Sequence, residues 1–226
     1  MGINTFAGME DTNMMIPVFT TAYLPPVSYF KTLVKTGKAM IEIHDHYNKQ
    51  SYRNRCEIYG ANGKQVLTIP VKKMHGNRTK VKDIQLDYET NWQKNHWKSI
   101  ESAYRSSAFF EHFEDILMPF YEKKYHFLID FNTEMLKTIL DIMELGIDLE
   151  FTERFIHDYE HPYFDCREAF HPKSHYIRKN INDHIIPYHQ VFSDKYGFLP
   201  NLSVIDLLFN EGMQANSILT KEQNNP

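Results

Sequence analysis

The sequence IPVFTTAYLPPVSYFKTLVKTGKAMIEIH, residues 16–44, carries the pattern that decides the fold. It opens with a short apolar and β-branched run of the kind that forms buried strands. Two consecutive prolines then force a turn, and residues 27–35 place apolar side chains at helical spacing. Gly37 fits the end of this helix, and residues 39–44 form a second apolar run. The stretch therefore predicts a β-α-β unit.

Two further apolar runs, residues 52–59 and 64–71, flank the tripeptide ANG at residues 61–63. Asn-Gly between two strand-like runs is typical of a β-hairpin, because both residues tolerate a positive φ. Residues 84–88 and the alternating run at residues 147–151 predict two more short strands, the second at a sheet edge. A β-α-β unit with an antiparallel hairpin predicts a mixed sheet, and the fold class is α/β.

Helical periodicity marks much of the remaining chain. It predicts long helices at residues 91–106 and 125–145, an aromatic-rich helical segment at residues 109–121, and a last helix at residues 202–211. Gly146 and Gly212 stand where the second long helix and the last helix would end. Ser203 and Asp206 have the spacing of a capping box, in which side chains satisfy free N–H groups at a helix start.

The chain of 226 residues fits one domain with an appendage. We expect a flexible leader at residues 1–13, an α/β core at residues 14–152, and an extension at residues 153–226 that packs on the core. Its two cysteines, Cys56 and Cys166, lie far apart, and the sequence shows neither a signal-peptide pattern nor an apolar run of about 18 residues. These features predict a cytoplasmic protein with free thiols, and Cys56 is expected to be a packed apolar side chain.

The charge balance disfavours some function classes. The net charge is -4 and the pI is about 6.3, so phosphate binding would have to come from a local patch and not from the chain as a whole. The residues form no evident nucleophile-plus-base pair, phosphate-binding loop or closed set of metal ligands. The sequence therefore names no reaction, and the cofactor stays unknown.

One local patch has the required character. Residues 48–55 read NKQSYRNR, and hydrophobic burial does not need so many cations and carboxamides in one short run. If this run belongs to a strand, Arg53 and Arg55 point to one face while Tyr52 and Asn54 point to the other. The cationic face is then a candidate for bidentate binding of a phosphate or a carboxylate.

A second interpretation of the patch stays open, in which the two arginines form ion pairs with sheet neighbours such as Glu42 or Glu57. Lys49 lies within the patch, and Lys72 begins a basic stretch that reaches Lys82 and extends the positive charge. This stretch is either a solvated loop or a lid that closes over a ligand.

Trp92, His96, Ile100 and Tyr104 recur every fourth residue and therefore share one face of the first long helix. His96 is a candidate general base if this face borders a cleft, since an imidazole titrates near neutral pH. The alternative is a buried, hydrogen-bonded histidine with a structural role.

His157 and His161, like His171 and His175, have the four-residue spacing of metal ligands on a helix. A proline beside each pair argues against a regular helix, so no residue is assigned to a metal. A metal-dependent hydrolase stays a third functional hypothesis, which requires one of these pairs to converge with a carboxylate.

The loop YLPP at residues 23–26 follows the first predicted strand, where many α/β folds bind phosphates at the start of a helix. It contains neither the glycines nor the histidine that a close approach to phosphates requires. A tight turn on which Tyr23 packs is the alternative interpretation.

Several motifs occur in a characteristic order. They are YLPP at residues 23–26, YF at 29–30, KQSYRNR at 49–55, IPVK at 69–72, NW at 91–92, His96, Tyr104 and GFLPNLSVIDLLFNEG at 197–212. Through these motifs, residues 16–210 resemble the bacterial WbqC-like protein family. The resemblance implies a role in the biosynthesis of surface polysaccharides of the O-antigen type, as a transferase that moves an acyl or aminoacyl group onto an activated sugar.

The chain departs from the family pattern in two places. The family has Gln-Pro before the Tyr-Leu-Pro motif, where this chain has Thr20 and Thr21. An acidic pair after the second strand is reduced to Asp45 between His44 and His46. If the replaced residues serve catalysis, the resemblance implies that this branch has altered or lost the activity.

Together these arguments predict a site in which His96 and Asp45 are catalytic. Its predicted substrate-binding residues are Tyr23, Lys49, Tyr52, Arg53, Asn54, Arg55, Lys72, Trp92 and Asn201. The expected partner is a small molecule such as a nucleotide sugar or an acyl donor, with no nucleic acid and no membrane insertion, and a homo-oligomer is a further expectation. The second hypothesis is a non-catalytic binding or scaffold protein, which would bury Phe164, Phe170 and Tyr176 in a symmetric contact.

Overall fold

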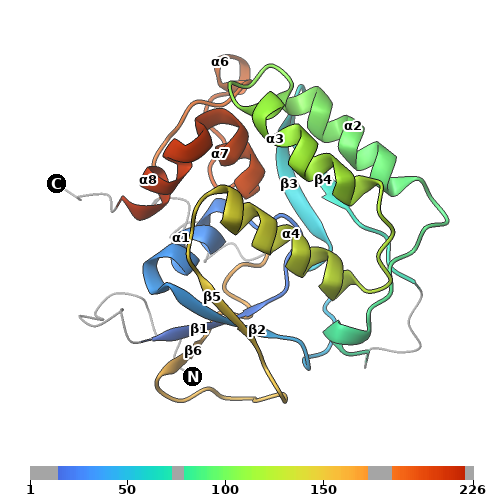
Figure 1. The fold of residues 1–226 in the computed structure, drawn as a ribbon, viewed down its shortest axis with the longest axis vertical. Coiled ribbons are helices and arrows are strands. Elements are labelled where there is room, and N and C mark those ends of the chain that lie inside the picture. Colours follow the sequence, from blue (N-terminus) through green and yellow to red (C-terminus); the bar gives the residue numbers. More distant parts are fainter. Residues whose placement is uncertain (1–14, 73–78, 173–184, 222–226) are drawn as a thin grey trace.

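The computed structural model describes residues 15–72, 79–172 and 185–221. The predicted leader at residues 1–13 and most of the predicted basic loop lie outside these ranges, as do His175 and Tyr176. Figure 1 shows a small sheet at one end of the molecule, a hairpin toward the other end, and helices around them. Within the described ranges, no helix is both long and apolar enough to cross a membrane.

A four-stranded parallel sheet forms one end of the fold (Figure 1). Its strands, in spatial order, are β5 (Asp148–Phe151), β2 (Lys38–Glu42), β1 (Ile16–Thr20) and β6 (Tyr163–Asp165). Helix α1 (Val27–Thr36) connects β1 to β2 and ends at Gly37, whose φ of 65° lets its N–H bond to the Leu33 carbonyl. The predicted β-α-β unit and the predicted edge strand β5 are confirmed.

Strands β3 (Arg55–Gly60) and β4 (Gly63–Thr68) form the predicted hairpin as a separate antiparallel pair. Gly63 closes the turn with a φ of 95°, which glycine adopts without steric cost. The α/β class is thus confirmed, with the parallel strands and the hairpin in two sheets. Two predictions are wrong. Strand β3 begins at Arg55 and not at Tyr52, and residues 84–88 form isolated bridges instead of a strand.

In Figure 1 the helices lie above the parallel sheet and beside the hairpin, with α1 nearest to the sheet. The other helices are α2 (Trp92–Tyr104), α3 (Phe110–Leu117), α4 (Leu128–Ile142), α6 (Ser193–Tyr196), α7 (Val204–Glu211) and α8 (Ala215–Thr220), with 3-10 turns at Val81–Asp83, Met118–Tyr121 and Gly212–Gln214. The prediction that Gly146 ends α4 is wrong. Glu144 instead adopts a φ of 53°, and the Leu145 N–H bonds to the Leu140 carbonyl, which closes the helix earlier without a glycine.

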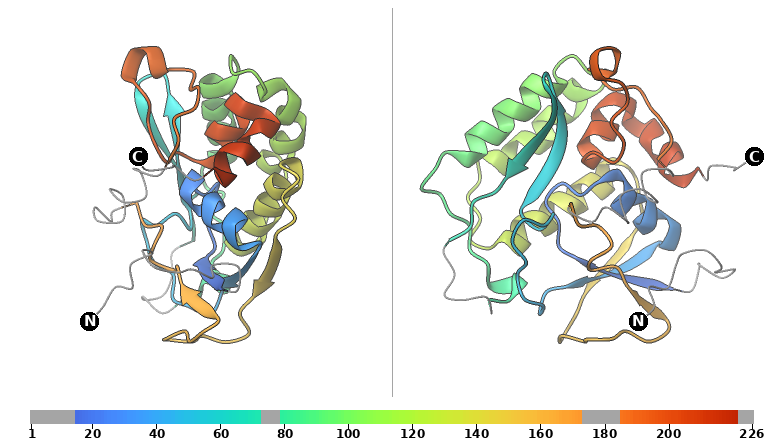
Figure 2. Two further views of the ribbon diagram at one scale, coloured as in Figure 1. Left: turned by 90° about the vertical axis from the view of Figure 1, so that its left-hand side faces the viewer. Right: turned by 180° about the vertical axis from the view of Figure 1, so that it is seen from behind.

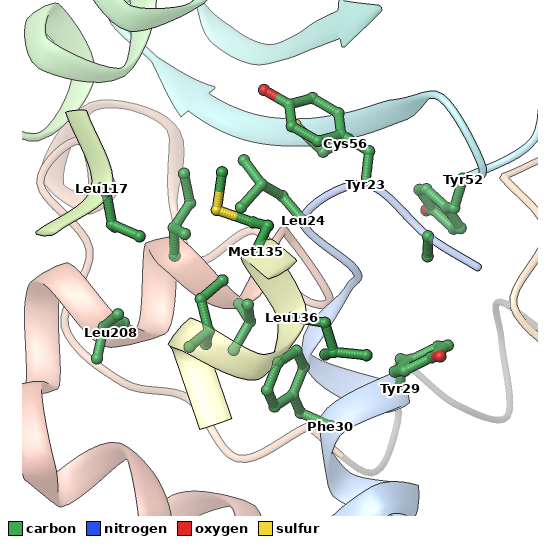
Figure 3. Close-up of a cluster of buried hydrophobic side chains, with 14 of the residues drawn as sticks. Tyr23, Leu24, Tyr29, Phe30, Tyr52, Cys56, Leu117, Met135, Leu136 and Leu208 are labelled. Carbon is green, nitrogen blue, oxygen red and sulfur yellow. The ribbon is translucent and has the colours of Figure 1, made fainter. Parts of the chain in front are cut away.

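One hydrophobic cluster joins elements from distant parts of the chain (Figure 3). Phe30 of α1, Leu136 of α4 and Leu208 of α7 are all buried in it. Cys56 of β3 is packed there too, as predicted, and burial raises the pKa of its thiol. The segment beyond residue 152 thus supplies strand β6 to the sheet and α7 to the core, while a domain boundary at that residue stays a prediction.

Asp206 of α7 is the centre of a buried hydrogen-bond network. Its carboxylate accepts from the Tyr104 hydroxyl at 2.9 Å, the Tyr188 hydroxyl at 2.7 Å and the Gln190 amide at 2.8 Å. Burial raises the pKa of Asp206 to about 6, although the three donors act in the opposite direction. The predicted capping box is therefore wrong, because Ser203 makes no side-chain capping hydrogen bond and Asp206 faces the interior.

The segment before α7 caps the start of α1. The N–H of Val27 donates to the Leu202 carbonyl at 2.9 Å, and the N–H of Ser28 donates to Asn201 Oδ1 at 2.9 Å. Asn201 does so with a φ of 59°, a conformation that asparagine tolerates better than most residues. Two of the N–H groups that a helix start leaves free are thus satisfied by a segment far away in the sequence.

We expect Asn201→Ala to lower the free energy of unfolding by about 1–2 kcal/mol, because it removes the capping oxygen and leaves a positive φ to alanine. Asn201→Asp keeps that oxygen and places a negative charge at the N-terminal end of the helix, so its stability should stay within about 0.5 kcal/mol of the native chain. Urea denaturation measures both variants. An Asn201→Ala variant that is as stable as the native chain would contradict the capping role.

Candidate functional site

The order of the strands creates a crevice at one edge of the parallel sheet. From β1 the chain passes to β2 on one side, and only much later does it add β6 on the other side. Figure 2 shows the segment after β6, in orange, leaving the sheet and running toward the middle of the molecule. Ligands of open parallel sheets bind outside the carboxyl ends of strands whose connections leave in opposite directions.

A shallow recess lies at this point, with a cavity volume of about 10 Å³, which is room for roughly one water molecule. Thr20 and Ala22 line it from the end of β1, and Cys166 and Arg167 line it from the end of β6. The other lining residues are Tyr29, Ser51, Tyr52, Arg53, Phe170 and His171. The strand order and the shape of the surface therefore indicate the same place, which we call the switch-point recess.

Arg53 brings a buried positive charge to the switch-point recess, since its side chain is only 2% exposed. Its Nη2 lies 3.4 Å from Asp45 Oδ2 and 3.9 Å from Glu168 Oε1, and no described group accepts a hydrogen bond from its Nε. Burial lowers the pKa of Arg53, while Glu168 and Asp45 raise it. A guanidinium stays charged under these conditions, so the recess contains a desolvated cation with loosely placed partners.

Asn132 of α4 fixes the backbone at Arg53. Its Nδ2 donates to the Arg53 carbonyl at 2.8 Å and to Thr21 Oγ1 at 3.1 Å, which holds the chain in a turn just before β3. Asn54 is tied to Ile69 in turn, with its Nδ2 2.7 Å from the Ile69 carbonyl. The predicted strand alternation of Arg53 and Arg55 is therefore wrong, because the strand begins only at Arg55.

The ion pairs that the sequence offered as an alternative have different partners. Glu57 pairs with Lys64 at 3.0 Å, and Glu42 accepts hydrogen bonds from Thr152 and Tyr159. The carboxylates beside Arg53 are instead Asp45, which follows β2, and Glu168, which follows β6. Both acidic residues stand at the carboxyl edge of the sheet, where the topology places the crevice.

Arg167 braces the segment that forms one wall of the switch-point recess. Its guanidinium binds both carboxylate oxygens of Asp165 and donates to the carbonyls of Ile156 and His157. The hydrogen bond to Asp165 raises the pKa of Arg167. Because these contacts already use four of its five N–H donors, Arg167 shapes the wall while Arg53 is the better candidate for a ligand contact.

His96 of α2 lies in a buried network that does not border the switch-point recess. Its Nδ1 is 3.0 Å from the Tyr23 hydroxyl, which is 2.9 Å from the Tyr121 hydroxyl. Burial lowers the pKa of His96 to about 4, outweighing a hydrogen bond to the Thr68 backbone, so the ring is neutral at pH 7. The geometry favours a structural histidine, and catalysis by His96 stays a prediction.

The remaining predicted residues divide into two groups. Tyr52, Arg53 and Asp45 come together at the switch-point recess. Asp45 contacts Arg53 but does not itself line the recess. The other predicted site residues that do not line it are Tyr23, Lys49, Asn54, Arg55, Lys72, His96, Trp92 and Asn201. Lys49 is exposed, Lys72 donates to Gln85 at 3.1 Å, and Asn201 caps α1. Of the family motifs, the turn at residues 51–53 and Tyr29 therefore contribute to this site.

The sequence did not assign Phe170 and His171, which line the switch-point recess, or Glu168, which approaches Arg53, to this site. They follow β6, a strand of only three residues that carries no periodicity of its own. The signal that was present is the charged motif Asp165-Cys166-Arg167, which is unusual beside an aromatic run. Its place at the sheet edge follows only from the pairing of β6 with β1.

Metal and assembly hypotheses gain no support from the described residues. Among them, no group of three or more histidine, cysteine, aspartate or glutamate side chains is arranged to hold a metal ion. Burial raises the pKa of the Cys166 thiol at the recess, which disfavours a thiolate nucleophile. Phe170 packs inward, with its ring centroid 5.5 Å from both Phe19 and Tyr29. A homo-oligomer stays a prediction.

Comparison with known proteins identifies the family of the chain. The model of the WbqC-like protein family matches residues 21–162, which is more than half of the chain. The uncharacterised protein Rv1507c of Mycobacterium tuberculosis is 25% identical over 233 residues, covering 90% of this chain and 96% of that protein. No solved structure shows a significant match. The resemblance drawn from the motifs is confirmed, and the chain belongs to the WbqC-like protein family.

Proposed function

We propose that this chain is a cytoplasmic transferase of surface-polysaccharide biosynthesis, which moves an acyl or aminoacyl group onto an activated sugar. The family resemblance motivates the biosynthetic setting. The observation that carries the proposal is the buried guanidinium of Arg53 in a recess at the topological switch point. A group that costs free energy to bury, and that has only loose partners, is better explained by a ligand than by stability.

Arg53 binds the anionic part of a substrate, a phosphate or a carboxylate. A charge-assisted hydrogen bond gains strength where water is excluded, and Asp45 keeps the guanidinium oriented. Ser51 and Thr20 supply hydroxyls to the same recess, and Tyr29 and Phe170 supply an aromatic wall. This mixture of one cation, hydroxyls and aromatic rings suits a small polar ligand with an apolar part.

His171 is the imidazole that lines the switch-point recess. In the proposed transfer, the attacking hydroxyl or amine of the sugar forms a bond to the acyl carbon and gives its proton to His171. The bond from the acyl carbon to the leaving group breaks, and the proton returns to that group. An imidazole performs both steps near neutral pH.

Replacing Arg53 with methionine should weaken the binding of nucleotide sugars or acyl donors by about tenfold or more, since one charge-assisted hydrogen bond is worth roughly 1.4 kcal/mol or more. Isothermal titration calorimetry against a panel of both ligand classes measures this loss. Arg53→Lys keeps the charge without the planar fork and should give an intermediate affinity.

Arg105→Met is the matched control, because Arg105 is an exposed arginine just beyond α2 and contacts Glu101 and Glu114 instead of the recess. Its ligand affinity should equal that of the native chain. If a folded Arg53→Met protein keeps the native affinity for every ligand that binds, Arg53 does not contact the ligand.

A further inference from the structure

The start of α1 has no N–H groups to offer a phosphate where other α/β folds use them. In such folds, the helix after the first strand points its N-terminal amides at a phosphate group. Here the N–H of Val27 is bonded to the Leu202 carbonyl and the N–H of Ser28 to Asn201 Oδ1. The segment at residues 201–202 therefore occupies the position of the phosphate, and anion recognition at this sheet edge depends on Arg53.

A single guanidinium sets limits on the anion. Its planar fork matches the two oxygens of one carboxylate, whereas a diphosphate carries more charge than one cation can balance. Arg53 also has the adjacent carboxylate of Asp45, 3.4 Å from Nη2, which further reduces the net positive charge available to a ligand. These features favour an anion of one negative charge.

Glu168 already brings such an anion to Arg53. Its Oε1 lies 3.9 Å from Nη2, beyond hydrogen-bond distance, and its side chain is 64% exposed. The exposed Glu168 carboxylate therefore approaches the buried Arg53 guanidinium without forming a hydrogen bond to it. It is free to move aside at little cost, because a contact of this kind contributes little to stability.

We propose that the switch-point recess binds a free carboxylate on the substrate, separate from the activated acyl carbon that is transferred and of the kind that a uronate sugar carries. This carboxylate takes the place of the Glu168 carboxylate beside Arg53. The inference rests on the proposed function and names the substrate class of the same site. The ligand carboxylate pairs with Arg53, including its buried Nε, and the rest of the ligand packs on Tyr29 and Phe170. Glu168 competes for the guanidinium and keeps the affinity low.

The test is isothermal titration calorimetry with acetate, glycine and inorganic phosphate, and with the matched pair UDP-glucose and UDP-glucuronate, which differ by one carboxylate. Glu168→Gln removes the competing charge from an exposed position and should bind the carboxylates about fivefold more tightly than the native chain, as expected for loss of one repulsive charge near the surface. Glu153→Gln, at an exposed position between β5 and β6, should bind them like the native chain.

The outcomes separate this inference from the proposed function. Tighter carboxylate binding in Glu168→Gln, together with its loss in Arg53→Met, supports both. Arg53-dependent binding of phosphate and UDP-glucose, with no gain for UDP-glucuronate and no binding of acetate or glycine, overturns the carboxylate class but leaves an anion site. Absence of Arg53-dependent binding by any probe overturns the proposed function as well.

Discussion

Replacing Asp206 with alanine is expected to lower the free energy of unfolding by about 4 kcal/mol, one of the larger effects that a single substitution produces. The change leaves the hydroxyls of Tyr104 and Tyr188 and the amide of Gln190 buried without their acceptor. Each unsatisfied buried donor costs about 1–3 kcal/mol, and the sum exceeds what is regained by no longer burying a carboxylate.

Chemical denaturation at pH 7 measures the loss. Asp141→Ala, which removes an exposed carboxylate from the last turn of α4, is the matched control and should change stability by less than about 0.5 kcal/mol. Asp206→Asn retains the volume and one acceptor oxygen, so its loss should lie between the two. A loss below about 1 kcal/mol for Asp206→Ala would mean that the network does not hold α7 to α2.

Asp206 and His96 should make the stability of the protein depend on pH in opposite directions. The folded pKa of Asp206 is raised to about 6, so its contribution is present at low pH and is lost as pH rises through that value. The folded pKa of His96 is lowered to about 4, so its contribution is present above about 6.5 and is lost as pH falls. Each effect amounts to about 3 kcal/mol, since one pKa unit corresponds to about 1.4 kcal/mol.

Subtracting a variant's unfolding free energy from that of the native chain isolates each group. Between pH 7 and pH 4 this difference should rise by about 2 kcal/mol for Asp206→Asn and fall by about 3 kcal/mol for His96→Gln. The native chain should change little over the same range on account of these two groups, because the effects offset each other. Asn95→Ala, which removes an exposed side chain without a titratable group from α2, should give a flat difference. A flat difference for His96→Gln would contradict its neutral, buried state.

The sequence predicts the local elements of this fold well, because each depends on neighbours in the chain. The β-α-β unit follows from apolar runs, two prolines and Gly37, and the hairpin follows from the Asn-Gly turn. Strand β6 escapes prediction since its three residues pair with β1 from more than 140 positions away. The role of Asp206 escapes prediction for a related reason. The three-residue spacing of Ser203 and Asp206 fits a capping box whether or not the Asp206 carboxylate is buried, and its partner Tyr104 lies far away in the sequence.

The candidate site could be predicted only in part. The unusual polarity of the run at residues 48–55 singled out Arg53, which lines the recess, and the family pattern singled out Asp45, which lies beside it. Their companion Glu168 reaches the site through the β6 pairing, which no periodicity reveals. His96 and Asn201 are polar residues at motif positions, but the first is buried against Tyr23 and the second against α1. Motifs mark residues that a fold needs as well as residues that a ligand needs.

The Asn201 cap means that α1 cannot be completed until most of the chain has left the ribosome. Ser28 and Asn201 are separated by 173 residues, and at roughly 5–20 residues per second the interval between their syntheses is about 9–35 s. During this time the apolar face of α1 that later contacts α7 and α8 has no partner from that part of the chain. We expect the nascent chain to need protection from aggregation during this interval, and shortened chains that stop before residue 201 to fold poorly.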